Sequence, residues 1–225
     1  MPKPSALFVA LTLAGACIAA VLGAAAQPAA PQNTSLFPDS TDIGITQPGA
    51  TTWNPATQTY ELTGGGADMW GGADAFRFAW TRISGDATLT ATVVFPPGSH
   101  PPNEKAVLIF RQSLDPSSPY ADVAIHADHH ITLQWRSNLG MFTQDVTAPS
   151  STFGPIGISR HGNRFTAFAT QRSGTLIDAQ NKFAHVDLTL PDPVYIGIGV
   201  CAHDADGLAT VTFSDVHLSS SATNP

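Results

Sequence analysis

The chain has 225 residues, a formal net charge of −7 and only 12% charged residues. A nucleic-acid-binding surface needs clustered basic side chains, and the excess of 17 acidic over 10 basic residues argues against one. The 43% hydrophobic share is sufficient for a buried core, while 19 glycines and 18 prolines indicate many turns. These values exclude a disordered chain, a coiled coil and a collagen-like repeat. We expect an acidic, turn-rich globular protein that does not bind nucleic acid.

Residues 1–26 have the parts of a secretory signal peptide in their usual order. Lys3 is followed by an apolar, alanine-rich run, and the small residues 24–26 precede Gln27. We predict a secreted protein, periplasmic or extracellular, with no membrane span after cleavage. A retained anchor is the less favoured alternative because no basic stop-transfer flank follows. Lipoprotein anchoring through Cys17 is also disfavoured, since the preceding leucine lies one position too far upstream.

Residues 27–40 are rich in proline, alanine and polar residues, which predicts a flexible N-terminal extension. No second linker or composition shift follows, so residues 41–220 are predicted to form one domain. After signal cleavage Cys201 is the single cysteine, which excludes an intrachain disulfide. Because it ends the apolar run 194–201, we predict that Cys201 is buried and structural.

Hydrophobic residues recur with a period of two along most of the chain, as in half-buried strands. In residues 88–95, Leu89, Ala91 and Val93 share one face and threonines occupy the other. The same alternation is found in residues 106–111, 122–126, 131–136, 164–169 and 209–213. Turn-forming clusters separate these runs, at residues 96–98, 115–119, 161–163, 172–174 and 204–207. The pattern predicts an all-β fold, a two-sheet antiparallel sandwich of a dozen or so strands.

Several segments resemble, in order, a bacterial family of concanavalin-A-like jelly rolls, the lectin/glucanase-type sandwiches. The first is YELTGGGADMWGGADAFRF at residues 60–78, and the others are residues 84–91, 105–116, 194–204 and 209–216. Together they cover most of residues 55–218. The resemblance implies a jelly-roll fold in a module of largely unknown function, found alone, in secreted proteins or attached to glycoside hydrolases. The Asp128-His129-His130 turn departs from the glycine-rich connection that the family would have there.

Polar side chains of two neighbouring predicted strands share one face. If the alternating apolar residues face the core, Asp122, His126, Gln134 and Arg136 point away from it and can be cross-strand neighbours. Arg111 and His203 join them by the same parity. Such groups suit a hydroxyl-rich ligand, and an arginine would also bind a uronate carboxylate. The alternative is a solvated sheet face whose ion pairs contribute little.

Aromatic side chains that can stack on sugar rings are a second candidate set: Trp53, Tyr60, Trp70, Trp80, Trp135 and Phe142. Trp80 and Trp135 have the parity of core residues and are predicted to be buried. Trp70 differs because glycines flank it on both sides, which is typical of an exposed loop. We predict Trp70, with Asp68 and Asp74, as loop contacts to a ligand. The glycine run is not a phosphate-binding loop, since no Gly-Lys-Ser/Thr follows.

Metal and cofactor sites are not indicated. His126, His129 and His130 lie within five residues, but adjacent histidines on extended backbone point apart. Residues 204–207 resemble the start of a calcium loop without its downstream acid, so a simple turn is predicted. We predict no cofactor, and a structural calcium stays open because it is common in concanavalin-like folds.

Catalysis is disfavoured because the chain has only Glu61 and Glu104 and lacks the Glu-x-Asp-x-x-Glu pattern of jelly-roll glucanases. The preferred function is an exported, monomeric, non-catalytic module that binds a carbohydrate or related polymer. The first alternative is a small secreted carbohydrate-active enzyme, a hydrolase or lyase, with Asp122 and His126 as an acid–base pair. The second is a structural or interaction protein of the cell envelope.

Overall fold

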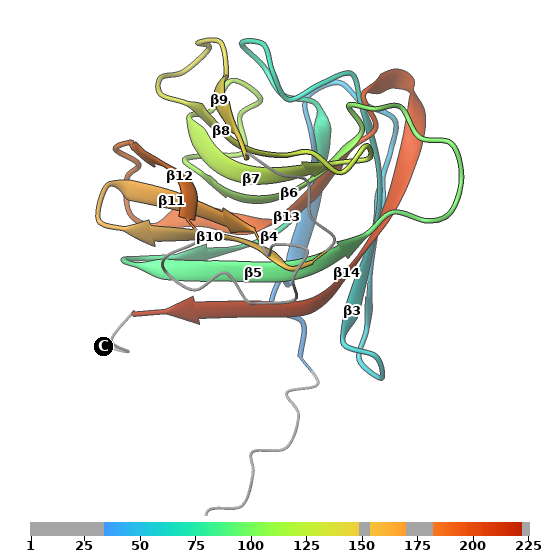
Figure 1. Ribbon diagram of the computed structural model, residues 1–225, viewed down its shortest axis with the longest axis horizontal. Coiled ribbons are helices and arrows are strands. Elements are labelled where there is room, and N and C mark those ends of the chain that lie inside the picture. The colour runs from blue at the N-terminus through green and yellow to red at the C-terminus, as the bar shows by residue number, and fades with distance from the viewer. Residues whose placement is uncertain (1–33, 149–153, 170–181, 222–225) are drawn as a thin grey trace, which may run out of the picture. The chain divides into compact units, whose positions relative to one another are not determined.

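The computed structural model describes residues 34–148, 154–169 and 182–221, and within these ranges it contains fourteen β-strands and no helix (Figure 1). In the same part of the chain, no helix is long and apolar enough to cross a membrane. The strands form two antiparallel sheets of seven strands each, so the predicted all-β sandwich is confirmed. The predicted signal peptide and the 172–174 turn lie outside the described residues, and export stays a prediction.

The first sheet, here called sheet A, contains the strands that carry most of the candidate residues. Its order is β1 (Asp39–Ile43), β4 (Phe76–Ile83), β13 (Val194–Cys201), β6 (Lys105–Arg111), β7 (Tyr120–His126), β8 (Ile131–Arg136) and β9 (Gln144–Thr147). Strands β6, β7 and β8 are consecutive in the sheet, so the two strands expected to carry the polar set are direct neighbours.

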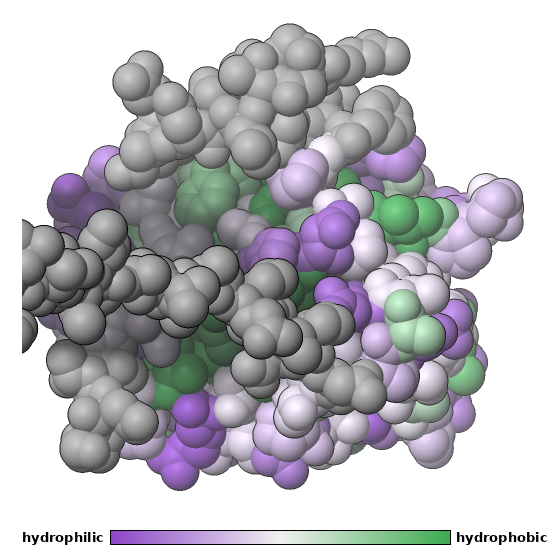
Figure 2. All heavy atoms as spheres, turned by 90° about the horizontal axis from the view of Figure 1, so that it is seen from below, coloured by the Kyte–Doolittle hydropathy of each residue, from purple (hydrophilic) through white to green (hydrophobic). Residues whose placement is uncertain are grey.

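The second sheet, sheet B, lies below sheet A in Figure 1. Its order is β12 (Lys182–Asp187), β11 (Arg164–Ala169), β10 (Ile156–His161), β5 (Ala87–Val94), β14 (Asp204–Ser220), β3 (Thr59–Gly66) and β2 (Ala50–Asn54). Figure 2 views this side from below. Where grey atoms do not cover it, hydrophilic and intermediate side chains surround smaller apolar groups.

The main hydrophobic core lies between the two sheets. Leu89 and Ala91 of sheet B belong to the same cluster as Val123 and Leu133 of sheet A, and each is at most 1% exposed. Burying one such large side chain is worth about 1.5–3 kcal/mol relative to leaving it in water. Trp135 packs against the same cluster while remaining partly exposed. The predicted strand phase is therefore confirmed for β5, β7 and β8.

Sheet A is buried on its outer face as well, which simple alternation did not predict. Val107 and Ile109 of β6 pack there in a second cluster with Phe76 and Phe78 of β4. Trp80 packs, partly buried, against this outer cluster rather than the core between the sheets. The reason is that the 67–75 loop, which joins β3 to β4, crosses this face and contributes Met69 to the cluster. A face that would otherwise be solvated is thus covered except at one end.

Gly66 marks the point where β3 ends and the 67–75 loop begins. Its φ is +119°, and a Cβ at this position would lie 1.8 Å from the Ala75 carbonyl oxygen. Only glycine permits both this backbone conformation and this close approach. The glycine run seen in the sequence therefore lets the loop return tightly onto β4.

Two predicted boundaries differ from the structure. The packed domain includes part of the 27–40 segment, because Phe37 is 4% exposed in the main core and β1 begins at Asp39. The prediction of a simple turn at residues 204–207 is wrong, because these residues form the irregular start of β14. A register shift between Asp204 and Ala209 explains the turn-like sequence there.

Candidate functional site

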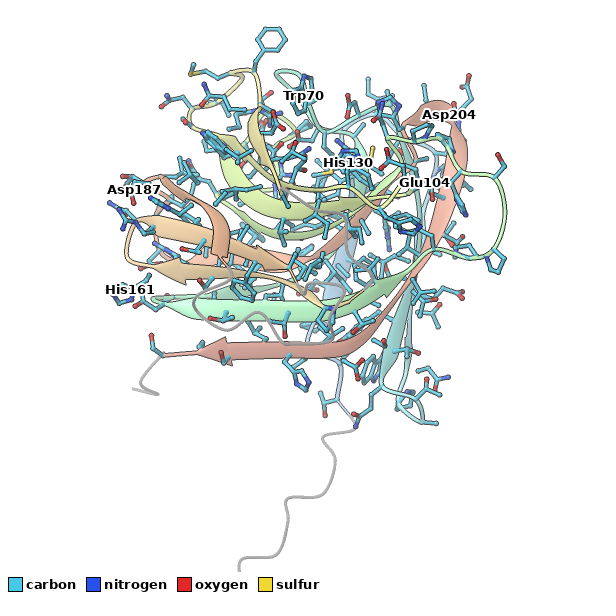
Figure 3. The ribbon with its side chains drawn as sticks, viewed as in Figure 1. Trp70, Glu104, His130, His161, Asp187 and Asp204 are labelled. Atoms are coloured by element: carbon cyan, nitrogen blue, oxygen red, sulfur yellow. The ribbon has the colours of Figure 1, made fainter. Side chains whose placement is uncertain are left out.

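A pocket of about 300 Å³ opens on the uncovered end of the outer face of sheet A. It lies over β6, β7, β8 and β9, next to the 67–75 loop. Figure 3 shows Trp70 and His130 on this side of the molecule, whereas His161 and Asp187 lie at its left edge. The lining side chains come from the strands named above and from four loops: Asp68, Trp70, Asn103, Lys105, His126, His130, Thr132, Gln134, Asp145, Thr147 and His203.

Strand pairing determines which side chains form the floor of the pocket. Lys105 of β6 is directly opposite His126 of β7, and Gln134 of β8 is directly opposite Asp145 of β9. Lys105, His126 and Gln134 are at most 4% exposed, so each offers only a small part of its surface to the pocket. His126 and Gln134 both line the pocket, as parity implied, but they are not cross-strand neighbours, because Gln134 is directly opposite Asp122, four residues along β7 from His126.

Two polar atoms of the floor have no hydrogen-bond partner among the described residues, the Oε1 atom of Gln134 and the Nδ1 atom of His126. Both atoms are themselves shielded from solvent, and a buried polar atom without a partner costs about 1–3 kcal/mol. The other ring nitrogen of His126, Nε2, is 3.4 Å from the Thr132 hydroxyl, and its ring stacks on His130 at 3.8 Å. Burial, with the nearby Lys105 charge, lowers the pKa of His126 to about 3. This imidazole is therefore neutral at physiological pH.

Asp122 lies beneath the floor rather than in it. It is fully buried opposite Gln134, does not line the pocket, and neither carboxylate oxygen has a hydrogen-bond partner among the described residues. Burial raises its pKa well above the usual value, against the opposing charge of Lys105. Asp122 is on the predicted face, but a ligand in the pocket would meet Gln134 in its place.

Asp68 and His203 form one wall of the pocket. The Asp68 Oδ1 atom accepts a hydrogen bond from the Lys105 ammonium at 3.1 Å and another from the Met69 amide at 2.7 Å. The His203 Nε2 atom lies 3.6 Å from the other Asp68 oxygen. The structure thus brings together two residues that the sequence suggested on separate grounds, and it adds Lys105.

Three other residues that the sequence suggested as ligand contacts are buried away from the pocket, so the sequence interpretation is wrong for them. Arg111, Arg136 and Asp74 are on or against the outer face of sheet A, as parity implies, but their side chains are fully buried. Arg111 Nη1 donates to Asp74 Oδ2 at 3.2 Å, and Arg136 donates to the same carboxylate at 3.0 Å and 2.6 Å. The paired groups are already satisfied, so they are not offered to a ligand.

This buried clamp of Asp74, Arg111 and Arg136 holds the loop that carries Trp70. Arg136 Nη2 donates to the Gly71 carbonyl at 2.7 Å. The Trp70 carbonyl accepts a hydrogen bond from the Thr143 amide at 2.9 Å. Trp70 remains 41% exposed and lines the pocket, as the glycine-flanked loop suggested. The arginines therefore act on the site only by positioning its aromatic side chain.

The remaining aromatic candidates do not line the pocket. Tyr60 is fully buried in the main core and contacts Trp53, with ring centroids 4.4 Å apart. Phe142 is 76% exposed on the loop after β8 and lies outside the pocket lining. Of the six aromatic residues considered from the sequence, Trp70 is the one that the structure places at this pocket.

Sequence reasoning missed Lys105, Asn103, Asp145 and Thr147. Lys105 has the same parity as Arg111, so extending the predicted strand by one residue would have found it. Asn103 and Asp145 are reached only through chain folding and carry no local signal. Among the described residues, no group of three His, Cys, Asp or Glu side chains could hold a metal ion.

Comparison with known proteins supports the fold. No family model matches the chain, and no curated protein matches it. A functionally unknown protein from Saccharomyces cerevisiae is 15% identical with a TM-score of 0.57, over 82% of this chain and 97% of that one. The carbohydrate-binding module CBM66 from Bacillus subtilis is 13% identical with a TM-score of 0.51, over 80% and 95% of the two chains. A family 7 alginate lyase is 13% identical with a TM-score of 0.44, over 75% and 80%. Likeness at such identities establishes the fold alone: this chain has the two-sheet sandwich of concanavalin-A-like jelly-roll proteins.

Proposed function

We propose that the protein is an exported carbohydrate-binding module that holds a saccharide in the pocket over β6–β9. The observation that carries the proposal is a pocket lined by polar side chains beside an exposed tryptophan. Sugar hydroxyls both donate and accept, so they suit the hydroxyl, amide and carboxylate groups of the lining, among them Thr132, Gln134 and Asp145. Trp70 offers a flat apolar surface to the C–H face of a sugar ring.

The size of the pocket and the structural comparison support the same function. A volume of about 300 Å³ is at the small end of ligand sites, which suits a sugar residue better than an extended polymer surface. CBM66, one of the proteins that shares the fold, is named a carbohydrate-binding module. Residues 1–26 support export, where polysaccharides would be met.

The protonation state of His126 and the location of Asp122, the two residues considered as an acid–base pair, favour binding over catalysis. A general base works best with a pKa near the operating pH, whereas the pKa of His126 is lowered to about 3. Asp122, the proposed partner, does not line the pocket. Because His126 stays neutral at physiological pH, its imidazole is better suited to hydrogen bonding than to proton transfer.

The test is a glycan array with the purified exported protein, followed by calorimetric titration of the best ligand. Trp70→Ala and Gln134→Leu are expected to weaken binding about tenfold or more, since each removes about 1.4 kcal/mol or more of contact. His161→Ala is the matched control, because His161 is exposed on another part of the molecule (Figure 3). Products released from the same glycans would instead favour the enzyme alternative. Failure to bind any glycan would refute the proposal.

A further inference from the structure

The charges around the pocket are arranged so that no positive group is left for an anionic ligand. Among the described residues that line it, Lys105 is the one lysine or arginine. Its side chain is 2% exposed, and its ammonium nitrogen lies 3.1 Å from the Asp68 carboxylate, which neutralises it. The Asp68 side chain is 35% exposed, so the pair is screened from one side, but the Lys105 side chain is buried and has Asp68 as its one ion-pair partner among the described residues.

The histidines of the pocket do not supply a free cation either. His203 lies 3.6 Å from Asp68, and His130 Nδ1 contacts the carboxylate of Asp128. His126 is neutral, because burial lowers its pKa to about 3. Each imidazole is therefore either uncharged or beside an acid.

A ligand carboxylate would also meet negative charge. Asp145, exposed at the mouth of the pocket, is directly opposite Gln134 across the β8–β9 pair. The two guanidinium groups that could have bound a carboxylate, those of Arg111 and Arg136, are buried against Asp74. A charged sugar would lose its hydration and receive no compensating ion pair.

We infer that the site selects uncharged saccharides and rejects uronates. The Lys105–Asp68 ion pair sets this preference, because it neutralises the lysine that could otherwise bind a carboxylate. The inference rests on the proposed function, which it narrows to one class of ligand. Hydroxyls can pair with the neutral donors and acceptors of the lining, such as Thr132 and Gln134, whereas a carboxylate finds no unpaired lysine or arginine among the described residues of the lining.

The experiment compares oligomers of glucuronate, galacturonate and mannuronate with the same oligomers after chemical reduction of their carboxyl groups. Within each pair, stereochemistry and linkage are equal and only the charge differs. We expect at least one reduced oligomer to bind, by calorimetry, about tenfold or more tightly than its parent. A tighter or equal affinity for the uronate form would overturn the inference and leave carbohydrate binding intact. Binding of neither series, nor of any neutral glycan on an array, would overturn both proposals.

Asp68→Asn tests the role of the ion pair itself. Asparagine has nearly the same shape, but it leaves the Lys105 charge uncompensated, so the affinity ratio of uronate to reduced form should rise about tenfold. Asp145→Asn, a surface change that does not affect packing, should raise the same ratio by a smaller factor. Asp187→Asn is the control, because Asp187 pairs with Arg164 on the surface in sheet B. An unchanged ratio in both Asp68→Asn and Asp145→Asn would overturn the proposed role of these charges.

Discussion

Replacing Asp74 by asparagine tests the buried clamp that supports the site. The carboxylate accepts three hydrogen bonds, one from Arg111 at 3.2 Å and two from Arg136 at 3.0 Å and 2.6 Å. The variant keeps the shape of the side chain but removes its charge. It also presents an amide donor to guanidinium groups that can only donate.

The expected magnitude follows from burial and from the contacts that remain. Removing one partner of a buried ion pair costs about 3–5 kcal/mol, because the remaining charge stays buried without compensation. Both arginines keep backbone acceptors: Arg111 donates to the Ser113 carbonyl at 2.7 Å, and Arg136 donates to the Met141 carbonyl at 2.8 Å. We therefore expect the lower part of that range, about 3 kcal/mol. For a domain of this size, Tm should fall by about 6–12 °C.

The assay is urea unfolding with scanning calorimetry at pH 7, with Asp187→Asn as the control. Asp187 also pairs with an arginine, but that pair is exposed to solvent, so the Tm of the control should match that of wild type. Trp70 is tied to the clamp through Gly71, so the Asp74 variant should also bind saccharide more weakly. A loss of stability under about 1 kcal/mol would refute the reasoning, because it would mean that the two guanidinium groups do not depend on Asp74.

Three further predictions concern groups outside the ligand contacts. Burial raises the pKa of Asp122, so the folded state keeps a proton that the unfolded chain releases above about pH 4. Wild-type stability should therefore fall with rising pH relative to Asp122→Asn, by at most about 1.4 kcal/mol per pH unit, and a constant difference in urea unfolding between pH 4 and 8 would contradict this. Cys201 is fully buried with its pKa raised to about 11 by burial, so its tryptic peptide should remain unalkylated by iodoacetamide at pH 7.5 unless the protein is first unfolded. Gly66→Ala should cost at least about 2 kcal/mol, whereas Gly71→Ala, where an added Cβ meets nothing within 4 Å, should leave Tm nearly unchanged.

The strand phase could be predicted because alternation is a local property of the chain. Leu89 and Val123 fall on the core side for the same reason that His126 and Gln134 fall on the other. Each successive residue of a strand points to the opposite face, so a few residues fix the whole strand. This argument gave the sandwich and the correct face for the floor of the site.

The roles of the polar residues could not be predicted, because they depend on contacts between distant segments. Arg136 and Gln134 have the same parity and look equivalent in the sequence. Arg136 is buried in an ion pair with Asp74, 62 positions away in the sequence, whereas Gln134 lines the pocket. Only the path of the 67–75 loop across sheet A distinguishes them. The same path covers the face on which Trp80 packs and places Asp68 against Lys105.

The central claim, that a saccharide binds over β6–β9 beside Trp70, is tested most directly by the indole N–H signals in NMR. Trp53, Trp80 and Trp135 pack against the two hydrophobic clusters, while Trp70 lines the pocket. During titration with a neutral oligosaccharide selected on the glycan array, the account predicts that the Trp70 indole signal and the Gln134 side-chain amide signals shift together and saturably. Saturable shifts elsewhere with both of these signals unchanged would contradict it.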